Sequence, residues 1–306
     1  LDSPVAIRGI KRFMVDQPVD TILPEVRENA KNAGRRIAIV GGGPTGLSAA
    51  YFLARLGYKP TVHEAESVAG GMLVQTIPAY RLPRERLAQE IALIESMGVT
   101  LKTNSRMGRD FTLQSLRDEG CEAVFLGIGA AKGSTLGIPN EDAEGVTEAL
   151  SFLKAANLST GLKVGKNVVV VGGGNAAIDA ARTAKRLGAD NVTIVYRRRR
   201  SEMPAWDEEI EEALREGVTL ETLVAPVEAK VENGRVVGLV CQRMELGAYD
   251  KSGRRRPVPI KGEIFEIPTD QIVAAIGQSV DADGLFGDLK VERNKDGTLK
   301  ADKITG

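Results

Sequence analysis

Short apolar runs alternate with amphipathic segments of helical periodicity along most of the chain. The first run, Ile37 to Val40, has the length of a buried strand, and a second strand is predicted from Thr61 to His63. Between them lies an apolar stripe at helical spacing, formed by Leu47, Ala50, Leu53 and Leu56. From residue 36 to about 140 the patterns predict strand, helix, strand, loop, helix, strand, helix and strand in that order. This alternation is typical of an α/β fold with parallel sheets.

Start and stop signals mark further elements in this half of the chain. A helix over Arg84 to Met97 follows a proline and stops at a glycine. We expect a buried strand over Glu122 to Ile128 and a helix over Val146 to Ala156. Before the first strand, Ser3 to Asp16 predicts a short amphipathic helix, whereas Asp16 to Gly34 is aperiodic and predicts a linker or surface strap.

The second half of the chain opens with the same pattern. The pattern predicts a strand over Asn167 to Val171 and then a helix that ends at Leu187. A second strand is predicted over Val192 to Tyr196. An acidic helix over Trp206 to Glu216 follows. Strands of an antiparallel type come next, with one polar loop among them: Val224 to Glu232, Arg235 to Leu246, the loop Gly247 to Lys261, Glu263 to Ile267 and Gln271 to Ile276.

Glycines follow the first predicted strand in the spacing G-x-G-x-x-G. Gly41 allows a sharp turn, Gly43 lets the backbone approach a pyrophosphate, and Gly46 lets helix and strand pack closely. The free N–H groups at the helix start then face the phosphate charge. Glu64, at the tip of the second strand, can accept hydrogen bonds from both ribose hydroxyls. Because strand, glycines, helix, strand and acid occur in order, the stretch predicts a nucleotide site rather than a structural turn.

The same unit occurs twice. Gly172, Gly173 and Gly174 follow the second repeat's first strand, and Asn175 and Ala176 open its helix. The stretches RLGYKPTVHEA and RLGADNVTIVYR are versions of one element. An internal repeat of a βαβ nucleotide unit predicts two dinucleotides bound to one chain.

The two repeats differ at the tip of the second strand. Where the first has Glu64, the second has Tyr196 followed by four arginines that begin with Arg197 and Arg198. A carboxylate repels a 2′-phosphate, whereas a guanidinium pairs with it through parallel N–H donors. We therefore expect an unphosphorylated adenosine, as in FAD, in the first repeat and NADPH in the second. A solvated face or a nucleic-acid patch is the alternative for such a run; its position in the repeat favours the phosphate.

Composition excludes several other classes. The 41 basic and 41 acidic residues cancel, which argues against nucleic acid or an acidic membrane as the main partner. No apolar run is long enough to span a membrane, and we see no signal peptide. Cys121 and Cys241 each sit in an apolar stretch and are expected to be buried thiols. The absence of C-x-x-C disfavours a flavin disulfide reductase, and a cytoplasmic setting fits.

Seven stretches together resemble the flavin-containing small subunit of NADPH-dependent glutamate synthase. The same module recurs in bifurcating ferredoxin–NADP oxidoreductases and in dihydropyrimidine dehydrogenase. The resemblance covers nearly the whole chain, and its motifs are VGGGPTGLSAA at 40–50, GGM and IPAYRLPRE within 70–85, VFLGIGA at 124–130, GIPNED at 137–142, VVVVGGGNAAIDAAR at 168–182, YRRRRSEMPA at 196–205 and VAAIGQ at 273–278.

The resemblance implies two nested Rossmann-like domains of the glutathione-reductase-like FAD/NAD(P)-binding fold, with an antiparallel crossover sheet. The expected division is 1–34 for the N-terminal helix and linker, 35–160 for the FAD-binding domain, 161–276 for the NAD(P)H-binding domain and 277–306 for a return to the first. The FAD site would comprise Gly41, Gly43, Pro44, Gly46, Glu64, Gly71, Met72, Arg81, Met107 and Gly129. The NADPH site would comprise Gly173, Gly174, Asn175, Ala176, Arg197 and Arg198, with Ala275 to Gly277 beside the nicotinamide.

Arg81 also has a physical rationale, because a cation there could meet the flavin pyrophosphate or ring carbonyls; the alternative is a surface arginine before a helix. His63, the single histidine, is interpreted as a packed residue rather than a ligand or base. We name no catalytic acid or base and no metal ligand, since hydride transfer from NADPH to FAD depends mainly on the alignment of two rings.

The resemblance further implies that electrons pass to 4Fe–4S clusters in a cysteine-rich segment upstream of this chain. The partner would be the glutamate synthase large subunit or another electron-accepting subunit. A ferredoxin–NADP oxidoreductase or a pyrimidine-reductase input subunit stays open, as does a non-catalytic assembly subunit with structural nucleotides. The family also has a further strand and a glycine–aspartate turn after Gly306. We therefore expect a fragment that binds NADPH but carries little FAD, with a mobile stretch between Glu66 and Arg81.

Overall fold

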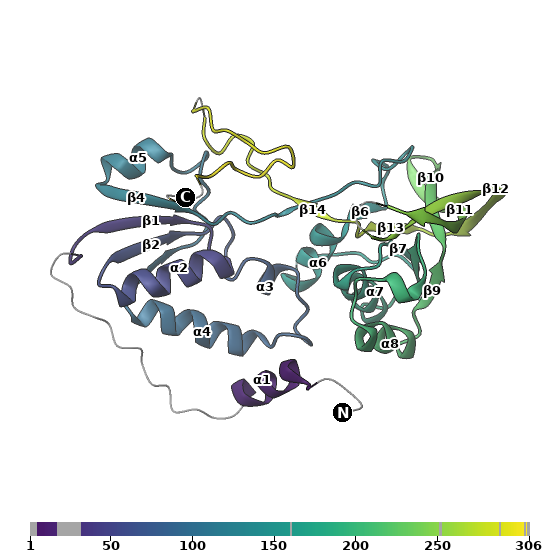
Figure 1. The fold of residues 1–306 in the computed structure, drawn as a ribbon, viewed down its shortest axis with the longest axis horizontal. Helices are drawn as coiled ribbons and strands as arrows, with labels where there is room; N and C mark the ends of the chain where they lie inside the picture. The colour runs from purple at the N-terminus through teal and green to yellow at the C-terminus, as the bar shows by residue number, and fades with distance from the viewer. Residues whose placement is uncertain are drawn as a thin grey trace.

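A computed structural model of the chain describes residues 5–16, 32–159, 161–250, 253–287, 289–302 and 304. It consists of two α/β units that lie side by side along the longest axis, with the first repeat in one and the second repeat in the other (Figure 1). Most of the predicted linker between the N-terminal helix and the first strand, 17–31, lies outside the described residues.

The first unit contains a four-stranded sheet in the order β3-β2-β1-β4. Its strands pair in parallel, as the alternation of strands and helices predicts. Helix α2 (Pro44–Arg55) starts at a proline in its first turn and buries Leu47, Ala50 and Ala54. The strands are β1 (Arg36–Val40), β2 (Lys59–His63), β3 (Thr100–Lys102) and β4 (Cys121–Leu126), and the further helices are α3 (Met72–Gln75), α4 (Arg84–Ser96) and α5 (Leu113–Asp118).

The prediction of a buried strand over Glu122 to Ile128 is wrong in its burial. β4 ends the sheet in the described part of the chain, and each of its residues is either exposed or half-buried. The apolar residues of β4 reflect one packed face. A short apolar run in a sequence does not show whether one face of a strand or both faces will be buried. For the same reason Cys121, at the start of β4, is half-buried rather than buried as expected.

The second unit is built around a five-stranded parallel sheet in the order β6-β13-β7-β8-β9. The chain enters it through β6 (Val146–Glu148), so the helix predicted from Val146 begins only at Ala149. These three residues pair in parallel with β13, so they form a strand and not the first turn of the helix. The remaining strands are β7 (Asn167–Val171), β8 (Asn191–Tyr196), β9 (Thr219–Thr222) and β13 (Gln271–Ala274), and the helices are α6 (Ala149–Asn157), α7 (Asn175–Arg186) and α8 (Asp207–Arg215).

Strand β7 lies at the centre of this unit and is buried on both faces. Val168 and Val170 pack with α6, α7 and α8. Val169 and Val171 point to the opposite face, where they pack against an antiparallel sheet. Alternate side chains of a strand point to opposite faces, so an unbroken run of valines fits a strand between two layers.

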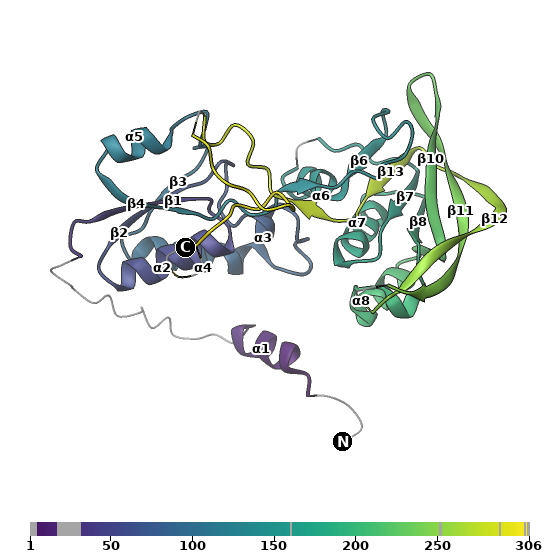
Figure 2. The ribbon, with the colours of Figure 1, turned by 45° about the horizontal axis from the view of Figure 1, so that its top comes forward.

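The antiparallel sheet has the order β10-β11-β12 and projects at the far end of the second unit (Figure 2). Strands β10 (Val224–Glu232) and β11 (Arg235–Tyr249) match the prediction closely. The polar loop predicted over Gly247 to Lys261 is wrong, because β12 (Arg255–Pro268) already pairs with β11 there. The stretch is polar because β12 is an edge strand of this sheet, and its prolines fit there because an edge strand tolerates a missing N–H donor.

Two short segments connect the units. β5 (Lys132–Gly133) leads from the first unit to the second and pairs antiparallel with β14 (Gln278–Ser279), which leads back. The returning chain reaches the first unit, where Gly284 lies against Gly108. Figure 1 shows this segment in yellow beside the first sheet.

The N-terminal helix α1 (Ile7–Asp16) is amphipathic as predicted and contacts both units. Arg8 forms an ion pair with Glu208 at the start of α8, and the Arg12 Nη1 donates to the backbone oxygen of Arg81 at 3.2 Å. None of the described helices has the length and apolar content needed to cross a membrane.

Candidate functional site

The first cavity, of about 430 Å³, opens where the carboxyl ends of β1 and β2 meet the glycine turn. Ligands in α/β sheets bind at such edges. Most residues predicted for the first nucleotide line this cavity: Gly41, Gly43, Pro44, Glu64, Gly71, Met72, Met107 and Gly129.

The glycine turn has the close contacts that its spacing predicts. Gly41 has a φ of 105°, and a Cβ there would lie 2.4 Å from the Gly127 oxygen. A Cβ on Gly46 would lie 1.9 Å from the Gly41 oxygen, so Gly46 supports packing and does not itself line the cavity. Gly43 caps α2 without a side-chain acceptor. The first N–H groups of the helix are therefore available to an anion.

Glu64 is fixed at the rim of the first cavity. Only 5% of it is exposed, its Oε2 accepts from the Gly42 backbone N–H at 2.7 Å, and its Oε1 accepts from the Glu66 N–H at 2.9 Å. A carboxylate held by two backbone donors keeps further lone pairs for hydroxyl groups. The arrangement fits a ribose with free 2′ and 3′ hydroxyls.

His63 is a packed residue, as expected. Its ring lies 4.4 Å from that of Phe111, and its Nδ1 is 3.0 Å from the Ser105 Oγ. Burial and the nearby charge of Lys102 lower the pKa of His63, which keeps the imidazole neutral at pH 7. His63 therefore supports the wall of the cavity.

Sequence reasoning missed several charged residues of the first cavity. Arg106, Lys132 and Lys154 line it together with Glu148 and Asp281. They come from a loop, from β5, β6 and α6, and from the returning chain, so no local motif connects them. The Lys154 Nζ pairs with Glu66 at 2.8 Å and so links α6 to the first unit.

The second cavity, of about 630 Å³, lies at the equivalent place in the second unit. Gly174 caps α7 without a side-chain acceptor, as Gly43 does for α2. A Cβ on Gly172 would lie 2.2 Å from the Ala275 oxygen. All residues predicted for the second nucleotide line this cavity: Gly173, Gly174, Asn175, Ala176, Arg197, Arg198, Ala275 and Gly277.

Hydrogen bonds show that Tyr196 occupies the position of Glu64. The Gly41 N–H donates to the His63 oxygen at 2.8 Å, and the Gly172 N–H donates to the Val195 oxygen at 3.0 Å. The next residues are Glu64 and Tyr196. The ring of Tyr196 packs against Gly173, and its hydroxyl donates to the Glu202 oxygen at 2.8 Å. The second repeat thus has no carboxylate at the strand tip.

Among the residues that the structure describes, three arginines and no carboxylate line the second cavity. Arg197 is exposed, whereas Arg198 is buried and donates to the Arg255 oxygen at 2.9 Å. The third, Arg254, comes from the turn between β11 and β12 and was not predicted. Its place in a run of three arginines was visible in the sequence, but its approach to Tyr196 was not.

The two cavities adjoin each other at the start of α6. Leu150 lines both, and the crossing strands contribute Lys132 to the first and Gly133 to the second. Two ligands bound along these cavities would therefore approach each other at this junction.

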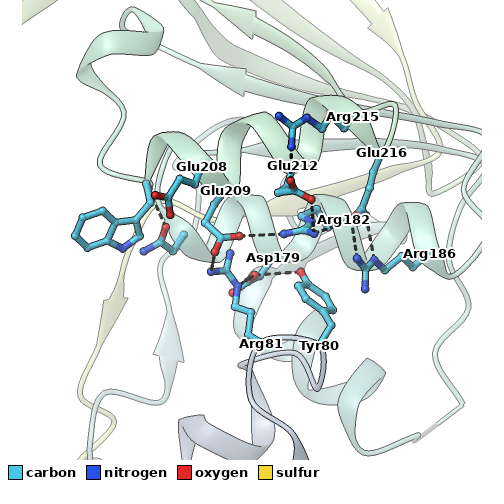
Figure 3. A network of polar contacts seen from close by, with 12 residues as sticks. Tyr80, Arg81, Asp179, Arg182, Arg186, Glu208, Glu209, Glu212, Arg215 and Glu216 are labelled. Atoms are coloured by element: carbon cyan, nitrogen blue, oxygen red, sulfur yellow. Dashed lines mark hydrogen bonds and ion pairs between the residues drawn. The ribbon is translucent and has the colours of Figure 1, made fainter. Parts of the chain in front are cut away.

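Arg81 does not line the first cavity, contrary to expectation. It points to the second unit, where its Nε lies 2.5 Å from Asp179 and its Nη1 lies 2.7 Å from Glu209 (Figure 3). Two carboxylates on α7 and α8 attract the guanidinium away from the glycine turn. Asn157 on α6 also bridges the units, because its Nδ2 donates to the backbone oxygens of Gln75 and Ile77.

The two cysteines lie apart from the cavities. Cys121 is in the first sheet, and Cys241 is in the core beneath the antiparallel sheet, where burial raises its pKa to about 12. Neither residue lines a cavity.

The sequence profile described as pyridine nucleotide-disulphide oxidoreductase matches residues 35–305. The chain is 43% identical to the NADP(+)-dependent formate dehydrogenase subunit beta of Moorella thermoacetica, covering 100% of this chain and 46% of that protein. It is 36% identical to the glutamate synthase [NADPH] small chain of Escherichia coli, covering 89% of this chain and 60% of that protein. The resemblance inferred from the motifs is thus confirmed. The chain spans about half the length of the first of these relatives.

Solved structures support the predicted fold class. The FprA protein of Mycobacterium tuberculosis, solved in complex with NADPH, matches with a TM-score of 0.69. The match covers 82% of this chain and 72% of that one, with 21% sequence identity.

Proposed function

The chain belongs to the pyridine nucleotide-disulphide oxidoreductase family, and from this premise we propose that it is the NADPH- and FAD-binding module of a flavin oxidoreductase. The observation that carries the proposal is the adjacency of two unlike nucleotide cavities. One has the Glu64 carboxylate at the strand tip, and Leu150 lines both. In the described part of the chain, three arginines and no carboxylate line the other.

The first cavity fits FAD. The uncapped start of α2 would face the pyrophosphate, Glu64 would bind the ribose hydroxyls, and Met107, buried beside the cavity, would pack near the adenine. Gly71 lies so close to Gly43 that a Cβ on it would be 2.8 Å from the Gly43 Cα. This approach keeps the floor of the pyrophosphate site free of side chains.

The second cavity fits NADPH. The uncapped start of α7 would face the pyrophosphate, and the arginines would meet the 2′-phosphate. Ala275 to Gly277 would then flank the nicotinamide near Leu150. When bound, the two groups supply a hydride donor and an acceptor that passes electrons on singly. The residues of the chain would bind both groups and orient their rings for the transfer.

The electron acceptor is proposed from the relatives. The Escherichia coli relative is a small chain of glutamate synthase, so we infer a glutamate synthase large subunit as the partner, with iron–sulfur clusters between them. A second candidate is an electron-input subunit of another oxidoreductase. It is favoured by the higher identity to the formate dehydrogenase subunit, 43% against 36%.

An anaerobic titration tests the proposed function. NADPH added to protein reconstituted with FAD should bleach the flavin absorbance, and NADH at equal concentration should bleach it less. A flavin spectrum unchanged by NADPH would show that the nucleotides are structural. With reduced protein, the rate of electron transfer to a purified glutamate synthase large subunit would separate the two candidate partners.

A further inference from the structure

The third arginine of the second cavity extends the proposed function, on which this inference rests. We propose that Arg254 and Arg197 together bind the 2′-phosphate of NADPH, and that Arg198 positions Arg254 and does not contact the phosphate. Arg254 lies 57 residues from Arg197 in sequence, outside the arginine run that the motif contains. It nevertheless lines the same cavity.

Hydrogen bonds bring Arg254 to the strand tip. Its Nη2 donates to the Tyr196 hydroxyl and to the Glu202 backbone oxygen, each at 3.1 Å. These acceptors lie beside the position where the first repeat has its ribose-binding acid. Within the described part of the chain, no acceptor contacts Nε or Nη1 of Arg254. A guanidinium has five N–H donors, so it retains donors for an anion.

The turn that carries Arg254 is fixed at its base. The Asp250 N–H donates to the Arg254 oxygen at 2.7 Å, and the Arg254 N–H donates to the Asp250 Oδ1 at 3.2 Å. The side chain therefore projects from a closed turn, which lowers the entropy lost when it binds a phosphate.

Arg198 has a different environment. Only 6% of it is exposed, its Nε donates to the Arg255 oxygen, and its Nη2 lies 3.6 Å from Asp250. It thus holds both the turn and the residue after Arg254. Asp250 partly compensates its charge, so Arg198 contributes less to an anion in the cavity than its motif position suggests.

The last two arginines of the run do not reach the cavity. Arg199 and Arg200 are absent from its lining, and Arg200 forms an ion pair with Glu211. Arg197, in contrast, is exposed at the cavity and has no hydrogen bond or ion pair with any described residue. Arg197 and Arg254 are therefore the two cations free to meet a dianionic phosphate, and each can donate two parallel N–H bonds.

Calorimetry with two small ligands measures recognition of the 2′-phosphate without any contribution from flavin or nicotinamide. 2′,5′-ADP and 5′-AMP differ only by that phosphate, so the ratio of their affinities reports its recognition. Arg254→Met and Arg197→Met should each weaken 2′,5′-ADP by about 10- to 100-fold and leave 5′-AMP within about twofold. Arg254→Lys should recover only part of the loss, because an ammonium lacks the planar fork.

Two variants control for charge. Arg256→Met removes an exposed arginine from the same hairpin, and Arg199→Met removes one from the run; neither residue lines the cavity. Both should bind 2′,5′-ADP as the wild type does. Thermal unfolding of each variant shows that it is folded.

The outcomes separate the two hypotheses. A wild type that binds both ligands equally would overturn the NADPH preference itself and this inference with it. A wild type that prefers 2′,5′-ADP, with the preference intact in Arg254→Met, would overturn the role of Arg254 alone. Equal losses of 2′,5′-ADP affinity in Arg254→Met and Arg256→Met would show that only the overall charge of the hairpin matters. That result would also overturn the role of Arg254.

Discussion

The Arg81 Nε of the first unit lies 2.5 Å from the Asp179 Oδ1 on α7 of the second unit. Asp179 also accepts from the Tyr80 hydroxyl at 3.2 Å, and the ring of Tyr80 lies beneath the guanidinium of Arg186, 4.0 Å away. Figure 3 shows that this cluster joins the loop before α4 to α7 and α8. A pair of opposite charges with little exposure therefore lies between the two nucleotide units.

Removal of one charge from this pair should destabilise the protein strongly. Asp179→Asn removes the shortest contact of the Arg81 guanidinium and leaves Glu209 as its remaining carboxylate, a change that costs about 1–3 kcal/mol. The free energy of unfolding in urea measures the effect. Glu208→Gln is the matched control on α8, because 78% of its side chain is exposed, and it should cost no more than about 0.5 kcal/mol. Equal values for the two variants would contradict the role of the buried pair.

Arg81→Met distinguishes the observed position of Arg81 from the expected one. We expect a lower free energy of unfolding, by about 2–4 kcal/mol, and an FAD dissociation constant within about threefold of wild type, because Arg81 does not line the first cavity. Flavin fluorescence quenching measures the second quantity. A tenfold loss of FAD affinity in a folded variant would show that Arg81 contributes to the flavin site after all.

Protonation of Glu216 should lower the free energy of unfolding as the pH falls. Hydrogen bonds from Arg186, together with Arg182, lower the pKa of Glu216 to about 2. A carboxyl whose pKa is lower in the folded state contributes stability above its unfolded pKa of 4.5, and this is lost as the pH falls toward 2. The contribution is on the order of 2–3 kcal/mol.

Glu216→Gln should therefore flatten the loss of stability between about pH 5 and pH 2, which denaturant midpoints at several pH values measure. Glu232→Gln removes an exposed carboxylate from β10 and serves as the control. If both variants keep the wild-type slope, Glu216 does not carry this dependence.

Glu64→Gln should weaken FAD by about 10-fold or more, because the amide replaces one acceptor of the ribose hydroxyls by a donor. Binding of 2′,5′-ADP should not change, since Glu64 lines only the first cavity. Glu90→Gln on the exposed side of α4 is the control for charge. An unaltered FAD affinity in Glu64→Gln would exclude Glu64 as the ribose ligand.

The sequence predicted best what depends on neighbours along the chain. The bounds of β7, Asn167–Val171, and β10, Val224–Glu232, match the expected strands residue for residue. The two glycine turns are also where the spacing placed them. In each case the signal is local: an apolar run, a glycine at a positive φ, or a strand followed directly by a helix.

What the sequence missed depends on contacts between distant segments. Nothing near Arg254 indicates that it reaches Tyr196, because the shape of the β11–β12 hairpin decides it. Arg81 was assigned by its motif, but Asp179 and Glu209 determine where it points. The three residues of β6 were expected to open the helix that follows them, and they form a strand because β13 lies beside them.

The strands that cross between the units, β5 and β14, pair over only two residues each. So short a ribbon offers little torsional stiffness, because twisting it strains very few main-chain hydrogen bonds. Side chains that bridge the two units, among them Arg81, Lys154 and Asn157, therefore contribute to the resistance to rotation. The angle between the two nucleotides is thus governed by polar contacts that single substitutions can alter while both sheets stay intact.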